Sequence, residues 1–204
     1  MALANYSDLL ASLAGWSNRT DLTAIIPDFV VLAEARIARD LRVRQMVTNT
    51  TLVTVANTQN VTLPTDWLET ENMSVLGSPP VNLLVITPEI MDQRFPAGYQ
   101  TGKPATYCVV GNTMQLGPTP DSAYSISMDY YAKITALATT ATNWLLTGHP
   151  GVYLSAAMAE LTLYLQDDQR ITLWDQKYRS EVSALQTADD QSLRSGSSMR
   201  VRYV

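Results

Sequence analysis

The acidic residues are the first candidates for chemistry in this chain. Asp66, Glu69 and Glu71 lie close together in the sequence, and two carboxylates that flank a glycosidic bond can supply the acid and the nucleophile of a glycan hydrolase. Carboxylates this close in an extended or turn segment more commonly lie on a solvated edge, and we interpret these three that way. Asp167 and Asp168 are better explained as a helix cap than as a metal site. The acids therefore predict no catalytic or metal centre.

Histidine and cysteine are too scarce to build such a centre. His149 is the only histidine; it precedes a proline at a predicted helix start and has no partner in the sequence that would make it a base or a metal ligand. Cys108 is the only cysteine, which excludes an internal disulfide, and its apolar surroundings favour a small buried hydrophobe over a reactive thiol. The sequence contains no phosphate loop, dinucleotide fingerprint or zinc-binding helix. We therefore expect no enzyme, no metal and no cofactor.

The four tryptophans are spread one to a segment. We interpret them as anchors that join β structure to helices, and a ligand-stacking platform is the alternative. They are Trp16, Trp67, Trp144 and Trp174.

The chain is acidic as a whole but basic at its C-terminus. The net charge of −5 and the pI near 4.8 argue against a protein that grips nucleic acid through its phosphates, because that binding depends on lysine and arginine. The segment 193–204 carries three arginines and no acid, so it has a charge of +3 and the remainder has −8 (−5 − 3). A basic arm therefore follows an acidic body.

The arm has the pattern of a strand without a sheet. Apolar and basic residues alternate near its end, and the segment is too short to form a sheet of its own. Such an arm can gain hydrogen bonds by lying along an edge or groove of another chain, where its arginines would select an acidic receiver; a frayed terminus is the alternative. The residues that carry this hypothesis are Arg194, Met199, Arg200, Val201, Arg202 and Tyr203.

A second basic group falls in a long helix predicted from Pro27 to about Met46. Two interpretations stay open. One is a solvated face with Glu34 and Asp40 as neighbours; the other is a surface that pairs with acids of a neighbouring subunit, since the guanidinium fork favours carboxylates. The group consists of Arg36, Arg39, Arg42 and Arg44.

This long helix has two predicted partners near the other end of the chain. Apolar residues recur at steps of three and four from Pro150 to Gln166 and again, out of phase, from Asp168 to Ala188, which predicts two helices with a break near Asp167. Their apolar stripes are too wide to remain in water, so they need partner helices. The predicted bundle core is Val30, Ile37, Leu41, Leu154, Met158, Leu161, Leu165, Trp174, Tyr178 and Val182.

The middle of the chain has the texture of strands. Threonine and valine are frequent there and charges are few. Segments 51–56 and 60–63 flank a turn-rich tetrad and suggest a hairpin, and 67–76 could add a third strand.

Clearer signals follow further along the middle segment. A cap at Thr87 predicts a short helix to about Arg94, and Gly111 with Asn112 predicts a tight hairpin. Polar and apolar residues alternate over 124–131, which predicts a half-buried strand. These signals together indicate a small antiparallel β unit.

The expected class is α+β: a bundle of about four helices with an inserted small antiparallel β unit and an extended C-terminal arm. The bundle is expected over 1–46 and 144–188, the β-rich unit over 47–143, and a flexible basic arm over 189–204. No run of about 18 to 20 apolar residues is present to span a membrane. The start of the chain lacks the pattern of a secretory signal, so we expect a protein made in the cytoplasm.

Several sequence blocks occur together in a characteristic order: Ile26–Arg44, Tyr107–Pro120, Tyr130-Tyr131, Asn143–Leu146, His149-Pro150, Tyr153-Leu154, and Asp167–Arg170 before Trp174 and Tyr178. Each block alone is weakly specific, but together they cover most of the chain. In these blocks and their order, the chain resembles the head-to-tail adaptor proteins of tailed bacteriophages.

The resemblance implies a structural virion protein. Such proteins form a homo-oligomeric ring, commonly a dodecamer, in the neck between capsid and tail. There they bind the portal protein and a tail or nozzle protein, and DNA passes through the ring without sequence-specific binding. The resemblance brings no catalytic motif. Two alternatives stay open: a virion-associated glycan hydrolase that uses Asp66 or Glu69, and a non-ring tail-completion or fibre-attachment protein.

Overall fold

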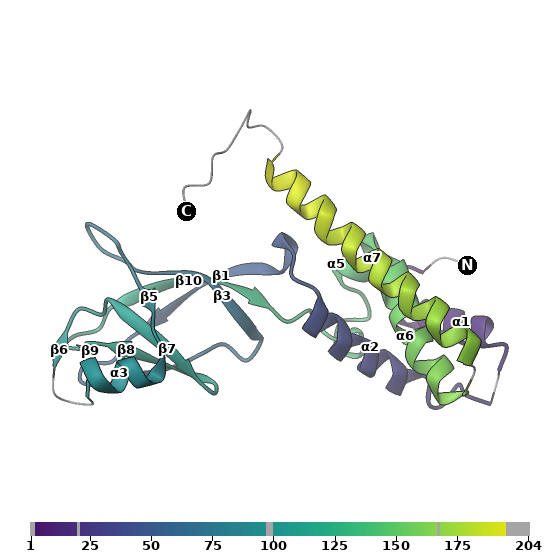
Figure 1. Ribbon diagram of the computed structural model, residues 1–204, viewed down its shortest axis with the longest axis horizontal. Helices are drawn as coiled ribbons and strands as arrows, with labels where there is room; N and C mark the ends of the chain where they lie inside the picture. Colours follow the sequence, from purple (N-terminus) through teal and green to yellow (C-terminus); the bar gives the residue numbers. More distant parts are fainter. Residues whose placement is uncertain (1–2, 20, 97–99, 167, 195–204) are drawn as a thin grey trace. The chain divides into compact units, whose positions relative to one another are not determined.

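The computed structural model describes residues 3–19, 21–96, 100–166 and 168–194, and it separates into two compact units (Figure 1). The helical unit comprises Met1–Arg44 and Ile134–Val204, and the β unit comprises Gln45–Lys133. The β unit is thus an insertion in the helical unit, and the predicted α+β class is confirmed. Among the described residues, no helix has the length and apolar character that crossing a membrane requires.

Helix α6 (Pro150–Tyr164) is the centre of the helical unit. Every residue from Val152 to Ala159 is buried, as are Leu161 and Thr162, which is expected for a helix covered on all sides. The helices packed on it are α1 (Tyr6–Ser17), α2 (Ile26–Asp40), α5 (Trp144–Gly148) and α7 (Asp168–Arg194). The apolar stripe of the sequence marks only one face of α6; the other face is buried as well because its small residues let neighbouring helices come close.

Three helices share one apolar interior. Of the residues expected there, Leu165 and Trp174 are only half-buried, and Trp174 lies edge-on against the exposed Trp16. The others are buried: Val30, Ile37, Leu41, Leu154, Met158, Leu161, Tyr178 and Val182.

Helix α2 is shorter than predicted. The spacing predicts a helix to about Met46, but α2 ends at Asp40, and Leu41 has the extended angles φ −98° and ψ 128°. The Arg42 guanidinium donates to the carbonyls of Ala38 and Leu41, both at 2.7 Å, so it satisfies acceptors that a helix end leaves open. The predicted end was wrong because this arginine cap leaves no trace in the apolar spacing.

Asn143 joins a short helix to the bundle. Its side-chain oxygen accepts a backbone N–H of the first turn of α5 at 2.9 Å, and its amide donates to the hydroxyl of buried Tyr153 at 2.8 Å. Burial raises the pKa of Tyr153 to about 12, so this hydroxyl stays neutral. Nearby, α4 (Leu137–Thr140) is tied to α2, because the Leu137 N–H donates to the Glu34 carboxylate at 2.8 Å.

A turn separates α6 from α7, as the out-of-phase stripes predict. Leu165 caps the end of α6, and Gln166 has a left-handed φ of 56°. The Gln166 N–H donates to the Leu163 carbonyl at 3.2 Å. Asp167, where an aspartate cap is predicted, lies outside the described residues.

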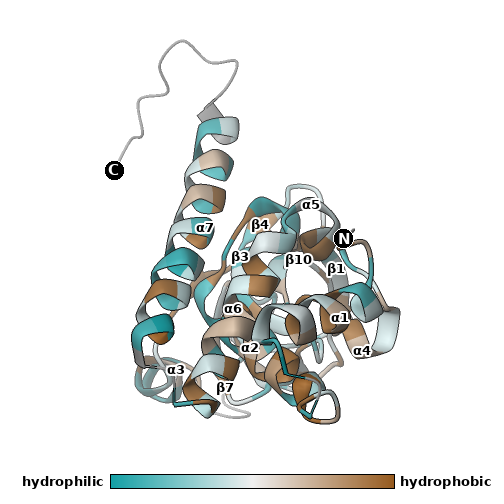
Figure 2. Ribbon diagram, turned by 90° about the vertical axis from the view of Figure 1, so that its right-hand side faces the viewer, coloured by the Kyte–Doolittle hydropathy of each residue, from teal (hydrophilic) through white to brown (hydrophobic). Residues whose placement is uncertain are grey.

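Helix α7 is longer than predicted. The apolar pattern ends at Ala188, but the helix continues to Arg194. The Asp189 carboxylate accepts the backbone N–H and the Nε–H of Arg44 at 2.9 and 3.1 Å, and the Ser192 hydroxyl donates to the Asp189 carbonyl at 2.7 Å. Polar contacts therefore extend α7 beyond its apolar stripe, and Figure 2 shows polar and apolar residues alternating along its length.

The described part of the β unit forms two four-stranded sheets and a two-stranded one. The first sheet has the order β1-β10-β3-β4 and is antiparallel. The second has the order β2-β8-β7-β5, and β5 pairs with β7 in parallel, as do β6 and β9 in the small sheet. The bounds are η1 (a 3₁₀ turn) Arg44–Met46, β1 Val47–Val53, β2 Asn60–Thr62, β3 Trp67–Val75, β4 Val81–Asn82, β5 Leu84–Val85, α3 Pro88–Arg94, β6 Thr101–Gly102, β7 Thr106–Val110, β8 Thr113–Gly117, β9 Thr119–Pro120 and β10 Ser125–Ala132.

One apolar core lies between the two larger sheets. Strand β10 contributes Ile126, Met128 and Tyr130 to it, as the alternation predicts. Strands β7 and β8 form the predicted tight hairpin, with Gly111 at φ 61°. Helix α3 begins at the predicted cap, where the Thr87 hydroxyl accepts a backbone N–H at 3.4 Å.

The hairpin expected between 51–56 and 60–63 does not form. Strand β1 pairs with β10 in the first sheet and β2 pairs with β8 in the second. The chain leaves β1 at Thr54, whose hydroxyl donates to the Ser122 carbonyl at 3.0 Å and accepts the Tyr124 N–H at 2.8 Å. The prediction was wrong because this contact with a distant segment outweighs the local turn signal.

Candidate functional site

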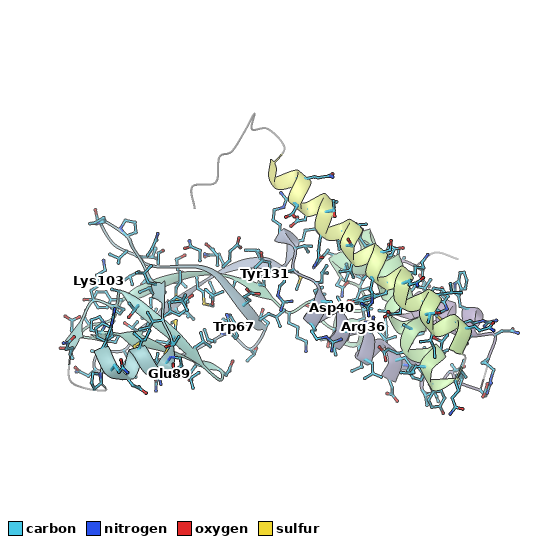
Figure 3. The ribbon with its side chains drawn as sticks, viewed as in Figure 1. Arg36, Asp40, Trp67, Glu89, Lys103 and Tyr131 are labelled. Carbon is cyan, nitrogen blue, oxygen red and sulfur yellow. The ribbon has the colours of Figure 1, made fainter. Side chains whose placement is uncertain are left out.

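Arg36 of α2 is the centre of a charged cluster in the helical unit. Its Nη2 binds Asp175 of α7, its Nη1 lies 3.7 Å from a Glu160 oxygen of α6, and its Nε lies 3.8 Å from Asp40. The guanidinium also lies over the ring of Tyr178, 4.2 Å from the ring centroid. One side chain therefore contacts three helices; Figure 3 labels Arg36 and Asp40.

The acids around Arg36 are held by further contacts. Asp175 accepts the Nε–H of Arg179 at 2.8 Å, and Asp40 accepts the Tyr178 hydroxyl at 3.1 Å. Only 15% of the Arg36 side chain is exposed, so its removal would leave partly desolvated carboxylates without their counter-ion. Because these groups come from different helices, the cluster fixes α2 and α7 against α6.

The cluster sets the ionisation of two of its members. The hydrogen bond from Arg36 lowers the pKa of Asp175 below its usual value. Burial, with the nearby Asp40, raises the pKa of Tyr178. At neutral pH Asp175 is therefore a carboxylate of low basicity and Tyr178 a neutral hydrogen-bond donor. Such an arrangement stabilises helix packing and is poorly suited to general-base catalysis.

The remaining basic residues of the predicted helix lie in different surroundings. Arg39 is an exposed side chain, 73% accessible, at 3.2 Å from Asp40. Arg42 caps the end of α2, and Arg44 pairs with Asp189 at 3.1 Å. Arg36 is thus engaged within its own chain and Arg39 faces solvent, and a role for this group between subunits stays a prediction.

The basic arm is described only at its start. Arg194 ends α7. A role of the arm in binding another chain stays a prediction. The other residues of that hypothesis lie outside the described part of the chain: Met199, Arg200, Val201, Arg202 and Tyr203.

The acids considered for glycan chemistry lie on and beside β3. The Asp66 carboxylate accepts the Tyr130 hydroxyl at 3.0 Å, and its carbonyl accepts the Lys133 N–H at 2.6 Å. Glu69 and Glu71 are exposed residues of the strand. Asp66 therefore ties the segment before β3 to the end of β10, which is a structural role.

His149 and Cys108 also have structural positions. The His149 N–H donates to the Leu145 carbonyl at 2.7 Å, and its own carbonyl accepts the Val152 N–H at 3.1 Å, so it forms the junction of α5 and α6. Cys108 is fully buried, its Sγ lies 3.5 Å from Gln115 Oε1, and burial raises its pKa. Within the described ranges, no three His, Cys, Asp or Glu side chains are grouped to hold a metal.

Sequence reasoning missed the partners of Arg36. The spacing of four between Arg36 and Asp40, and between Asp175 and Arg179, is visible in the sequence and predicts pairs within one helix. The contact between the two helices is not visible, because the sequence gives no register of α2 against α7. Tyr178 is expected in the apolar core, and its hydroxyl contact is likewise missed.

Comparison with known proteins gives the family of the chain. A model of the SU10 adaptor protein family matches residues 4–202 and so includes both units. A search of curated proteins gave no match. The chain belongs to the SU10 adaptor protein family, a family of phage head-to-tail adaptors, and is a structural component of a phage virion.

Proposed function

We propose that this adaptor assembles as a closed ring in the virion neck. The ring joins the portal protein on one side to a tail or nozzle protein on the other, and DNA passes through it. The family match over residues 4–202 is the observation that carries the proposal. Twelve copies are the number that the resemblance to head-to-tail adaptors implies.

The charge of the β unit supports passage of DNA without retention. Residues 45–133 contain seven aspartates and glutamates and three lysines and arginines, a net charge of −4 (3 − 7). A surface of this sign repels phosphates, whereas tight DNA binding needs basic residues that displace counter-ions. The proposal therefore includes no sequence-specific DNA contact.

The packing of the helical unit supports a mechanical role. Helix α6 is covered by its neighbours along most of its length, and Arg36 joins α2, α6 and α7 through ion pairs. A body held by both apolar and charged contacts keeps its shape when neighbours press on it. A ring between capsid and tail needs this property, and it needs no catalytic group.

Reconstitution with the portal protein tests the proposal. The full-length chain and purified portal would be mixed and studied by light scattering and electron microscopy, with portal alone as the control. We expect a portal complex that carries a ring of adaptor density. An adaptor that stays monomeric and never binds portal would contradict the proposal, whereas a monomer in the absence of portal would not, because assembly can be linked to binding.

A zymogram on cell-wall material tests the catalytic alternative with the same preparation. We expect no clearing. Clearing by the wild-type chain that is lost in Glu69→Gln would indicate a glycan hydrolase instead.

A further inference from the structure

An exposed apolar groove lies between α1 and α7 of the helical unit. Trp16 and Leu173 are 58% and 64% exposed, and the rings of Trp16 and Trp174 lie 5.5 Å apart at an interplanar angle of 89°. Large apolar side chains gathered around a hollow are typical of a contact surface. The α1–α7 groove has a volume of about 390 Å³ and is lined by Trp16, Met158, Arg170, Leu173, Trp174 and Lys177.

The groove residues that belong to α7 recur at helical spacing along one side of that helix. Leu173 and Trp174 follow Arg170 by three and four positions, and Lys177 follows it by seven. Glu181 lies one turn further on, 11 positions after Arg170 (181 − 170), with an oxygen 3.9 Å from the Lys177 ammonium. Eleven residues are about three helical turns, so all five share one side of the helix. This side of α7 therefore has a basic end at Arg170, an apolar middle at Leu173 and Trp174, and an acidic end at Glu181.

Helix α2 carries a second exposed stripe, on the side away from the core. Val31 and Leu32 are 57% and 51% exposed. Asp28 precedes them by three and four positions, Ala35 follows, and Arg39 lies 11 positions after Asp28 (39 − 28); these three are exposed too. We call these five residues the α2 stripe. It has an acidic end, an apolar middle and a basic end.

The α2 stripe and the groove side of α7 match in spacing and are opposite in charge. Suppose that the two helices lie parallel with Asp28 opposite Arg170, and that positions are counted from these two residues. At positions three and four, Val31 and Leu32 of one helix then meet Leu173 and Trp174 of the other. At position 11, Arg39 meets Glu181. At position seven, the small Ala35 lies opposite the long Lys177 and leaves space for it. Each charged end therefore meets its opposite across an apolar centre.

In a ring, neighbouring copies are related by rotation about one axis, so a helix of the next copy must keep its direction and its height along that axis. The proposed contact between α2 and α7 meets this condition. Inside one chain, α2 and α7 run parallel, because Arg36 contacts Asp175 while Asp40, further along α2, contacts Tyr178 and Gln186, positions 139, 138 and 146 apart. The proposed pairs, 28 with 170 and 39 with 181, are both 142 apart (170 − 28 and 181 − 39). The α2 of a second copy would thus lie parallel to α7 and at the height of the α2 already there. Rotation about an axis parallel to the helices changes neither the direction of α2 nor its height along that axis.

We propose that the α2 stripe of one copy packs into the α1–α7 groove of the next copy. The inference rests on the ring of the proposed function and names its contact. Because the two surfaces differ, the contact is head-to-tail and repeats around a circle, whereas identical patches would stop at a two-fold dimer. Helix axes at such a contact lie about 8 to 10 Å apart.

Crosslinking of full-length chains on the portal tests this contact. Val31→Cys and Leu173→Cys would be combined in one chain and treated with a short bismaleimide; Cys108 is buried and stays unreacted. We expect a ladder of covalent multimers on a denaturing gel, and only monomers from either single variant. The matched control combines Val31→Cys with Gln176→Cys, an exposed position of α7 outside the groove, and should give monomers.

Charge reversal provides a second test that does not depend on crosslinking. Asp28→Arg and Arg170→Asp should each raise the adaptor concentration needed for ring assembly by about tenfold or more, as like charges meet. The two reversals together should bring that concentration back to within about threefold of wild type. Thermal melting of each variant shows that the chain is folded. Reversals that add their defects without rescue would contradict the contact.

The outcomes separate this inference from the proposed function. Rings on the portal without a ladder would overturn the contact and leave the ring intact. A covalent dimer from Val31→Cys alone would indicate a two-fold contact and overturn the inference. Portal complexes without any ring would overturn both proposals.

Discussion

The two units of this adaptor fix their elements by different means. In the helical unit, charged side chains reach between helices, and Arg36 alone contacts three acids. In the β unit, antiparallel ladders set the register around an apolar core that includes Met73, Met114 and Met128. Only three of the 14 lysines and arginines lie in the β unit. We therefore expect the helical unit to respond to charge and pH and the β unit to respond to volume.

Replacement of Arg36 should give the largest effect and should be confined to the helical unit. Arg36→Met keeps the length of the side chain and removes the charge, which leaves partly buried carboxylates uncompensated, so we expect a loss of about 3 kcal/mol in the free energy of unfolding. Hydrogen exchange with mass spectrometry would show less protection in α2 and α7. Arg39→Met, at an exposed position, is the matched control and should cost less than about 0.5 kcal/mol. An equal loss of protection in β3 and β10 would contradict the comparison.

A substitution that adds volume to the β unit should destabilise that unit and leave the helical unit unchanged. A Cβ on Gly117 would lie 2.5 Å from the Phe95 ring and 2.8 Å from Met91 Sδ, so Gly117→Ala should cost about 1 to 3 kcal/mol through overpacking. Exchange should rise in β7, β8 and α3 and stay unchanged in α6. Gly102→Ala is the control, because its nearest contact is an ordinary 3.5 Å; a similar loss there would show that backbone freedom, not space, is responsible.

Acid should weaken the helical unit before the β unit. The pKa of Asp175 is lower in the folded chain than in the unfolded chain, mainly through the Arg36 hydrogen bond. The unfolded chain therefore binds more protons between these two values, and the stability that Asp175 contributes is present above the unfolded pKa and is lost as pH falls through the folded pKa. Urea unfolding between about pH 6 and pH 3, set around the ordinary aspartate pKa of about 3.9, measures it. In Asp175→Asn, the part of the pH dependence of the free energy of unfolding that comes from Asp175 should disappear. An unchanged pH dependence would show that other acids are responsible for it.

The smallest expected change is a gain in the helical unit. Gln166 has a φ of 56° between α6 and α7, a conformation that glycine adopts without the strain of a side chain. Gln166→Gly should raise the free energy of unfolding by about 0.5 kcal/mol, since part of the gain is offset by the entropy of the unfolded chain. Thermal melting measures it, and Gln176→Gly, at an exposed position inside α7, is the control that should lose about 1 kcal/mol. A loss at Gln166 would show that its side chain has a role in the turn.

Local patterns in the sequence predict much of this fold. The alternation in β10, the Gly111 hairpin and the Thr87 cap all come from neighbouring residues, and the structure contains all three. The end of α2 and the pairing of β1 could not be predicted, because Arg42 and Thr54 act through hydrogen bonds to atoms that no periodicity reveals.

The candidate site was harder to predict than the fold. The basic residues of α2 are visible in the sequence, and so is their preference for carboxylates. Which carboxylates they meet depends on how far α2 is displaced along α7, and helical spacing repeats too regularly to select one displacement. Arg36 therefore looks the same as Arg39 in the sequence, although one is enclosed and the other faces solvent.

The contact between Arg44 and Asp189 has a consequence for how force travels through the chain. Arg44 is the last residue before the β insertion, and Asp189 lies in the last turns of α7, shortly before the C-terminal arm. Tension applied at the C-terminal end of α7 meets this link before it reaches the apolar interior. The link is partly exposed and breaks at lower cost than the interior, so it would yield first and spare the packed helices from the pull.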